Sequence, residues 1–220
     1  GLFTHDINNM VHSIGNAIEL IQQNLTGQPE VEGWFDLIVR QLERGKKMIQ
    51  NIQNLSEIEK SEMRIEPMDV MATLENAVEF TRYNYRNRII EVNLKNGDGS
   101  VKVLANVLLS DVFENLLINS IQYNEQEEVR IDVDVTEMRE ETSDVVCIEF
   151  KDNEIGIPDS EKKEIFNPES MKRHSKGMGL GLSHIARLLA LWKGEIWVED
   201  NVSGDHTQGS NFIIKLPKAS

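Results

Sequence analysis

Three glycines at alternate positions, Gly177, Gly179 and Gly181, constrain the fold of this chain more than any other feature. Glycine destabilises the interior of both helices and strands, so the run predicts a loop. The residues that follow, through Leu191, have the apolar spacing of a helix. A loop that opens a helix gathers unpaired backbone N–H groups at the positive end of the helix dipole. Such a place suits a phosphate chain, although a glycine-rich turn without a ligand is about as common.

The composition narrows the classes of function that the 220-residue chain can have. Hydrophobic residues make up 40% and charged residues 27%, which allows one large or two small domains with a buried core. The net charge of −14 argues against nucleic acid or an anionic membrane as the main partner, because phosphate contacts need clustered Lys and Arg. The apolar runs fall well short of the ~20 residues that span a bilayer. The single cysteine, Cys147, lies in an alternating apolar segment, which predicts a buried thiol in an intracellular protein.

Residues 1–66 predict a helical hairpin. Apolar or small residues recur in 4-3-4-3-4 steps, the heptad seam of a helix packed lengthwise against others. Residues 25–30 contain a glycine and a proline and predict the turn, and a second helical pattern runs from Trp34 to Ile58. Two helices alone bury too little apolar surface, so we expect the hairpin to dimerise into a four-helix bundle. Because Gly1 lies almost inside the first helix, we expect the chain to be part of a longer protein.

His5 falls at the most exposed position of the first heptad, with Asp6 directly after it and Asn9 one turn away. On most helices such a group is ordinary solvated surface. Alternatively, an exposed imidazole can attack a phosphoryl group, with Asp6 as a base or orienting residue for the ring. Asn9 can then position water for the reverse hydrolysis. Spacing alone leaves both interpretations open.

The remaining residues predict a second domain of alternating helices and strands with several polar motifs. Asn115 and Asn119 share one helical face, where they either border a cleft whose amide oxygens suit Mg²⁺ or act as structural caps. Asp152 ends a strand and precedes a turn, so its carboxylate can accept a hydrogen bond from an adenine amino group. A basic patch at 172–174 precedes the glycine run and can cover phosphates as a lid, and residues 137–144 predict an acidic, mobile loop. We expect helices over 71–85, 106–123 and 182–191, and strands over 89–94, 101–104, 129–135, 145–151, 194–199 and 211–216.

Taken in order, the motifs resemble the cytoplasmic core of sensor histidine kinases. They are His-Asp-Ile-Asn-Asn from residue 5, Asn-x-x-x-Asn from 115, Asp-Asn-x-x-Gly-Ile-Pro from 152, Gly-Met-Gly-Leu-Gly-Leu from 177 and Gly-Ser-Asn-Phe from 209. The resemblance implies an α+β fold. A hairpin over 1–66 would form a dimeric four-helix bundle for dimerisation and histidine phosphotransfer. An α/β sandwich over 67–220, with a mixed sheet backed by helices, would bind ATP as in gyrase, Hsp90 and MutL.

The same resemblance implies a cytoplasmic enzyme that uses ATP and Mg²⁺. It would phosphorylate its own histidine, pass the phosphoryl group to an aspartate of a response regulator, and also dephosphorylate that regulator. The implied partners are the regulator and a second copy of the chain, without nucleic acid and without membrane contact from this part. His5 would be the phosphoacceptor, Asp6 its acidic neighbour, and Asn9 the residue for dephosphorylation.

The resemblance also assigns residues to the nucleotide. Asn115 would bind Mg²⁺, Asn119 would lie beside the phosphates and Tyr123 near the adenine. Asp152 would read the adenine amino group, and Gly156 would shape that wall. The other implied contacts are Ile157, Lys172, Arg173, Gly177, Gly179, Leu180, Gly181 and Leu182.

Three residues depart from the family pattern. Met10 replaces a proline in the phosphoacceptor helix, which should therefore lack a proline kink. Glu154 replaces a glycine in the adenine-side turn, so we expect strain in that turn or weaker ATP binding. Glu169 replaces a lid phenylalanine. Glu154 also motivates an alternative, a phosphatase-biased or pseudo-kinase scaffold with little kinase activity. An ATPase clamp of the gyrase or Hsp90 kind is disfavoured, because position 115 is Asn rather than a water-activating Glu.

Overall fold

The computed structural model describes residues 14, 64–96, 100–140, 143–167 and 180–219. The chain divides into two compact units, Gly1–Glu62 and Met63–Ser220. In the first unit only Ile14 is described, and it is helical. The hairpin, its dimerisation, His5, Asp6, Asn9 and the departure at Met10 therefore lie outside the described residues and stay predictions, as does the domain boundary.

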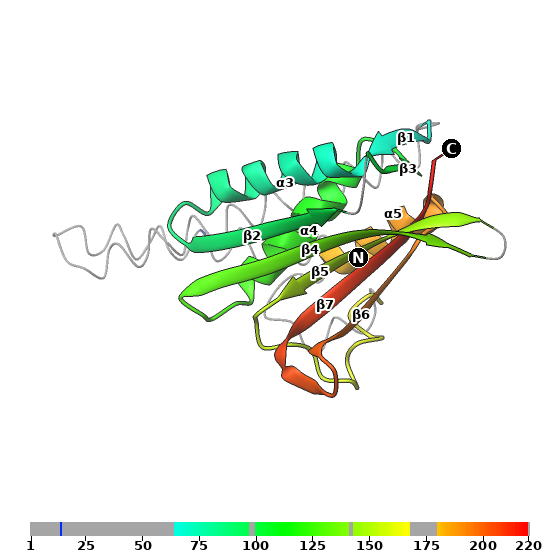
Figure 1. Ribbon diagram of the computed structural model, residues 1–220. Coiled ribbons are helices and arrows are strands. Elements are labelled where there is room, and N and C mark those ends of the chain that lie inside the picture. Colours follow the sequence, from blue (N-terminus) through cyan, green and yellow to red (C-terminus); the bar gives the residue numbers. More distant parts are fainter. Residues whose placement is uncertain (1–13, 15–63, 97–99, 141–142, 168–179, 220) are drawn as a thin grey trace, which may run out of the picture. The chain divides into compact units, whose positions relative to one another are not determined.

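A five-stranded mixed sheet is the frame of the second unit (Figure 1). The strand order is β2-β4-β5-β7-β6, so β5 is the central strand. β2 pairs with β4 in parallel, and the other neighbours pair antiparallel. β1 and β3 form a separate antiparallel pair. The strands are β1 (Glu66–Asp69), β2 (Ile89–Asn96), β3 (Lys102–Ala105), β4 (Glu128–Arg139), β5 (Asp144–Asp152), β6 (Glu195–Val202) and β7 (Asp205–Pro217).

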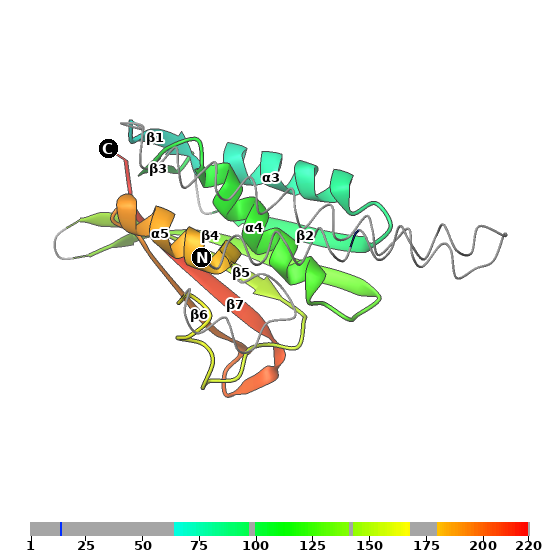
Figure 2. The same ribbon diagram turned by 180° about the vertical axis from the view of Figure 1, so that it is seen from behind.

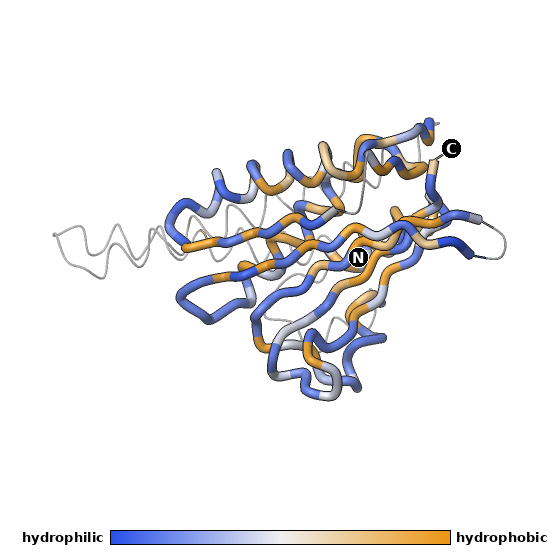
Figure 3. Tube along the Cα trace, in the orientation of Figure 1, coloured by the Kyte–Doolittle hydropathy of each residue, from blue (hydrophilic) through white to orange (hydrophobic). Residues whose placement is uncertain are grey.

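Three helices cover one face of this sheet, as the two opposite views show (Figures 1 and 2). They are α3 (Val70–Asn84), α4 (Leu109–Gln122) and α5 (Leu180–Leu191). Hydrophobic and hydrophilic residues alternate along several strands (Figure 3). Because successive side chains of a strand point to opposite faces, this alternation turns the hydrophobic ones toward the helices. In β5, Ile148 and Phe150 are fully buried, and the Phe150 ring lies 5.8 Å from that of Phe113 on α4, centroid to centroid. The core therefore lies between α4 and the middle of the sheet.

The face away from the helices carries charged side chains. Lys151 of β5 lies 2.8 Å from Asp134 and 3.1 Å from Glu149, measured from Nζ to the carboxylate oxygens. Pairs of this kind at a protein surface contribute only about 0–1 kcal/mol each. Cys147 lies on the same face as a free, buried thiol, which confirms its prediction, and burial raises its pKa. Within the described ranges, no helix is long and apolar enough to cross a bilayer.

Most predicted elements are confirmed to within a few residues at their ends. α4 begins at Leu109 rather than near Asn106, because the Asn106 Oδ1 atom accepts a hydrogen bond from Leu108 N and shapes a turn before the helix. The predicted bounds of the acidic loop, 137–144, were wrong. β4 continues to Arg139, which pairs with Asp144 at the start of β5, so residues 137–139 and 144 belong to the ladder and the connection is confined to 140–143. β1 was not predicted.

Candidate nucleotide-binding site

Asp152, the last residue of β5, lies at the centre of the candidate site. Its carboxylate is 1% exposed and accepts three hydrogen bonds from protein donors. Ser120 Oγ of α4 donates to Oδ2 over 3.0 Å, and Ser210 N of β7 donates to Oδ1 over 2.8 Å. Glu154 N donates to Oδ1 over 3.3 Å. A carboxylate has about four acceptor positions, so this one is fixed in orientation and can still accept a further donor.

The electrostatics of Asp152 follow from these contacts. Burial raises the pKa of its carboxyl to about 6, and the hydrogen bonds from Ser210, Ser120 and Glu154 act in the opposite direction. The carboxylate is therefore mainly ionised at pH 7. A buried, ionised acceptor fits the predicted partner, which is an amino group of a base.

Two glycines permit the close packing around Asp152. A Cβ atom on Gly156 would lie 2.2 Å from the His206 carbonyl oxygen and 2.7 Å from that of Gly209. Gly209 has φ of +109°, and a Cβ atom there would lie 2.1 Å from the Asp152 carbonyl oxygen. Side chains at these positions would push the turn after β5 away from the start of β7.

The turn after β5 is also held by Asn153. Its Oδ1 atom accepts hydrogen bonds from Asn124 Nδ2 over 2.8 Å and from Arg130 N over 2.9 Å. Its Nδ2 atom donates to the Glu128 carbonyl over 3.0 Å. Asn153 therefore ties the turn to the start of β4 and to the loop after α4, which makes this end of the site rigid.

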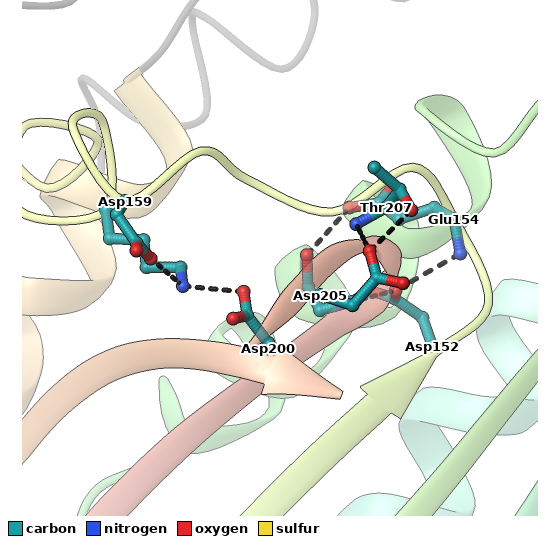
Figure 4. Close-up of polar contacts among 8 residues, drawn as sticks. Asp152, Glu154, Asp159, Asp200, Asp205 and Thr207 are labelled. Atoms are coloured by element: carbon teal, nitrogen blue, oxygen red, sulfur yellow. Dashed lines mark hydrogen bonds and ion pairs between the residues drawn. The ribbon is translucent and has the colours of Figure 1, made fainter. Parts of the chain in front are cut away.

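Glu154, which follows in the same turn, is 6% exposed. Ser210 Oγ donates to its Oε1 atom over a long 3.5 Å (Figure 4). Within the described part of the chain, its buried Oε2 atom has no hydrogen-bond partner. Burial first, and the charge of Asp152 second, raise the pKa of Glu154 to about 9. The expectation of strain is not met in the backbone: among the described residues, the non-glycine residue with positive φ is Lys193. Glu154 is thus a neutral carboxylic acid at pH 7.

The other end of the site is formed by Asn115 on α4 and Gly181 on α5. Asn115 is 9% exposed, and its Nδ2 atom donates to the Asp111 carbonyl over 2.7 Å. Its Oδ1 atom is buried and has no hydrogen-bond partner among the described residues. A Cβ atom on Gly181 would lie 3.5 Å from that oxygen, so the first turn of α5 faces it. An amide oxygen without a donor fits Mg²⁺, which takes oxygen ligands and usually keeps waters and substrate phosphates as well.

The other predicted site residues are distributed around these two ends. Asn119, Ile157 and Leu182 are half-buried, and Tyr123 caps the C-terminus of α4 with 49% of its surface exposed. Leu180 begins α5. Lys172, Arg173, Gly177, Gly179 and the departure at Glu169 lie outside the described residues.

The segment that leads toward the predicted lid is anchored to the sheet. Lys162 Nζ lies 2.5 Å from Asp159 and 2.6 Å from Asp200 of β6, the contacts drawn between those residues in Figure 4. The Phe166 ring meets that of Phe212 on β7 edge to face, with centroids 6.5 Å apart. The chain is therefore fixed up to the residues just before the lid.

Sequence reasoning missed the two serines that orient Asp152, Ser120 through its hydroxyl and Ser210 through its backbone N–H. Ser120 follows Asn119 directly, and Ser210 lies in the Gly-Ser-Asn-Phe motif, so both stand next to singled-out residues. They lie 32 and 58 positions from Asp152 in the chain. Only the packing of α4 and β7 against the end of β5 brings them together.

An open mixed sheet backed by helices, with a buried carboxylate at the end of its central strand, defines the fold as an α/β sandwich. Residues 104–220 match the family described as "Histidine kinase-, DNA gyrase B-, and HSP90-like ATPase". The chain belongs to this family.

Similar proteins refine that placement. The chain is 24% identical over 226 residues to the Autoinducer 2 sensor kinase/phosphatase LuxQ of Vibrio harveyi, a match that covers 97% of this chain and 25% of LuxQ. The chain thus spans a quarter of that relative's length. Among solved structures, the catalytic domain of histidine kinase ThkA has a TM-score of 0.60 at 22% identity, with 72% of this chain and 100% of that one covered. ThkA in complex with response regulator protein TrrA has a TM-score of 0.74 at 19% identity, with 98% and 60% covered. The structural likenesses show the fold, and with the family they support an ATPase catalytic domain of a sensor histidine kinase.

Proposed function

We propose that this chain is the cytoplasmic catalytic core of a sensor histidine kinase. It binds Mg-ATP, transfers the γ-phosphoryl group to His5, and passes it to an aspartate of a response regulator. The observation that carries the proposal is the Asp152 carboxylate, buried, ionised and held by three donors with capacity for one more. Such a group can accept one further donor at this place, and an adenine amino group is one.

The spacing along α4 supports a ligand with a base at one end and phosphates at the other. Ser120, which holds Asp152, and Asn115 are five residues apart, which is about 7.5 Å along the helix axis. Asn115 would contribute its free Oδ1 atom to Mg²⁺, and the first turn of α5 would face the phosphates with its backbone N–H groups. Mg²⁺ supplies charge neutralisation of the phosphates when it is bound.

His5 and its neighbours would act on the phosphoryl group itself. Asp6 would accept the imidazole proton or hold the ring, so that the neutral nitrogen attacks. Asn9 would position water when the regulator is dephosphorylated. The hairpin would dimerise and would present the regulator-binding surface. The solved complex of ThkA with TrrA, a histidine kinase with a response regulator, supports this choice of partner.

The test is incubation with γ-labelled ATP and Mg²⁺. We expect a label that is lost in acid and stable in alkali, as for phosphohistidine. The His5→Gln variant should lose the label and still bind ATP, whereas His12→Gln, on the same helix pattern, should keep it. Label that persists in His5→Gln would overturn the assignment of the phosphoacceptor.

The second candidate is a phosphatase-biased or pseudo-kinase scaffold. It is favoured by Glu154, whose buried carboxyl stands beside the group that would read the base. Tight nucleotide binding without any labelled histidine would support the scaffold, and a labelled His5 would exclude it.

A further inference from the structure

Glu154 has a buried oxygen that nothing in the described protein satisfies. Its carboxyl is 6% exposed, and Oε1 meets only the long contact from Ser210 Oγ, while Oε2 has no partner. Buried polar atoms are rarely left in this state, and those that are call for a specific reason. The turn has no left-handed backbone at this residue, so the carboxyl is placed there without strain.

The position of Glu154 links it directly to the carboxylate that is proposed to read the base. Its backbone N–H and that of Ser210 donate to the same oxygen of Asp152. The Ser210 hydroxyl then contacts the Glu154 carboxyl. Ser210 therefore bridges the two acidic side chains.

The two carboxyl groups carry different charges at neutral pH. The pKa of Asp152 is raised to about 6 and that of Glu154 to about 9, in both cases first by burial. Among the described titratable residues, Asp152 is the one whose charge acts on Glu154. At pH 7 to 8 the pair therefore consists of an acceptor, Asp152, beside a proton donor, Glu154. Because Oε1 accepts the hydrogen bond from Ser210 Oγ, we place the carboxyl proton on Oε2.

We propose that Glu154 is a specificity-determining residue for the purine, donating its Oε2 proton to a ring nitrogen while Asp152 accepts from the exocyclic amino group. Adenine presents an amino donor next to a ring-nitrogen acceptor, which matches this pair. Hypoxanthine presents the reverse order, an oxygen acceptor next to an N–H donor, and would face both groups with the wrong partner. This inference rests on the proposed nucleotide site and deepens it.

The experiment measures dissociation constants of Mg-ADP and Mg-IDP for the full chain at pH 7.5 and 9.5 by calorimetry. The variants are Glu154→Gln, which keeps a donor that does not titrate, and Glu154→Gly, which removes the side chain. Glu125→Gln, at an exposed acidic position, is the matched control. Circular dichroism checks that each variant is folded at both pH values.

For the wild type, we expect the dissociation constant of ADP to rise about fourfold from pH 7.5 to 9.5, because only the protonated fraction binds. Glu154→Gln should change by less than about twofold and keep the preference for ADP over IDP. Glu154→Gly should lose the pH dependence and reduce that preference about tenfold, as expected when a buried hydrogen bond is removed. Glu125→Gln should follow the wild type.

Three outcomes would overturn the inference in distinguishable ways. Glu154 is a packing residue if the ADP affinity of the wild type does not change with pH and its preference for ADP over IDP equals that of Glu154→Gly. Tighter ADP binding by Glu154→Gly would mean that the carboxyl obstructs the base. If the folded wild type binds neither nucleotide at either pH, the proposed nucleotide site fails, and this inference fails with it.

Discussion

The two ends of the candidate site differ in how far the protein completes them. At the Asp152 end, donors from α4, β7 and the following turn satisfy one carboxylate. At the other end, the Asn115 Oδ1 atom is buried beside Gly181, and no described residue donates to it. The first end is organised by the protein alone, whereas the second needs a ligand to satisfy it. Base recognition should therefore tolerate substitution poorly, and phosphate recognition should depend on the metal.

The Asp152→Asn variant should break the base end and produce the largest effect. The amide keeps the shape of the side chain, and its NH₂ group at the Oδ2 position can donate to the Ser120 hydroxyl, which can donate in turn to the Leu116 carbonyl. We expect ADP affinity to fall by at least about 100-fold, because the base loses its charged acceptor and its amino group meets a second donor. Calorimetry with Mg-ADP measures the loss.

The control for Asp152→Asn is Asp132→Asn, on the face of the sheet away from the helices, where the carboxylate lies 3.5 Å from Lys95. That variant should bind ADP as the wild type does. Binding by Asp152→Asn within about tenfold of the wild type would show that a charged acceptor is not what this end of the site supplies.

The Asn115→Ala variant should affect the phosphate end only when the metal is present. We expect the affinity for ATP to fall about 10- to 30-fold in Mg²⁺, from the loss of one oxygen ligand and its placement of the phosphates. In EDTA the variant and the wild type should agree within about threefold, because the base end is unchanged. Fluorescence titration with a labelled ATP analogue, in Mg²⁺ and in EDTA, measures the affinity of both proteins under each condition.

Asn93→Ala is the matched control for Asn115→Ala, since Asn93 donates from β2 to Asp132 on the exposed side of the sheet. Its ATP affinity should not change in either buffer. An equal loss for Asn115→Ala with and without Mg²⁺ would argue against Asn115 as a metal ligand.

The difference between the two ends also explains what the sequence could predict. Periodicity located most helices and strands, and motif order located Asp152, Gly156 and Asn115, because these signals are local. The orienting roles of Ser120 and Ser210 depend on how β5, α4 and β7 pack, which no local pattern contains. β1 was not predicted because it has only four residues and contains Pro67, which is rare in strands. The β4–β5 ladder was predicted too short because its last residues belong to an acidic segment with the composition of a loop.

Glu154 is a case in which the sequence pointed to the right residue but not to its state. Its place in a turn where the family pattern has glycine indicated a departure, and strain was the expected consequence. The structure instead gives a buried acid with an ordinary backbone. Whether a carboxyl is ionised depends on its burial and on nearby charge, and both are properties of the fold.

The last effect that we predict is on stability without a nucleotide, and it examines Glu154 separately from Asp152. A carboxyl whose pKa is higher in the folded state binds more protons there than in the unfolded chain, so stability falls as pH rises between the two pKa values. For Asp152 this range ends near pH 6, and for Glu154 it extends from 4.5 to about 9. Between pH 6.5 and 8.5, the wild type should therefore lose up to about 1.4 kcal/mol per pH unit relative to Glu154→Gln.

Urea unfolding of the wild type, Glu154→Gln and the exposed control Glu125→Gln across this range provides the measurement. Groups remote from Glu154 are unchanged in Glu154→Gln, so the difference in the free energy of unfolding reports Glu154 and its coupling to Asp152. The wild type and Glu125→Gln should run in parallel, and Glu154→Gln should become more stable than both as the pH rises. If all three curves stay parallel up to pH 8.5, Glu154 is already ionised in the folded state. It would then be an acceptor like Asp152, and the base end would hold two like charges instead of a donor beside an acceptor.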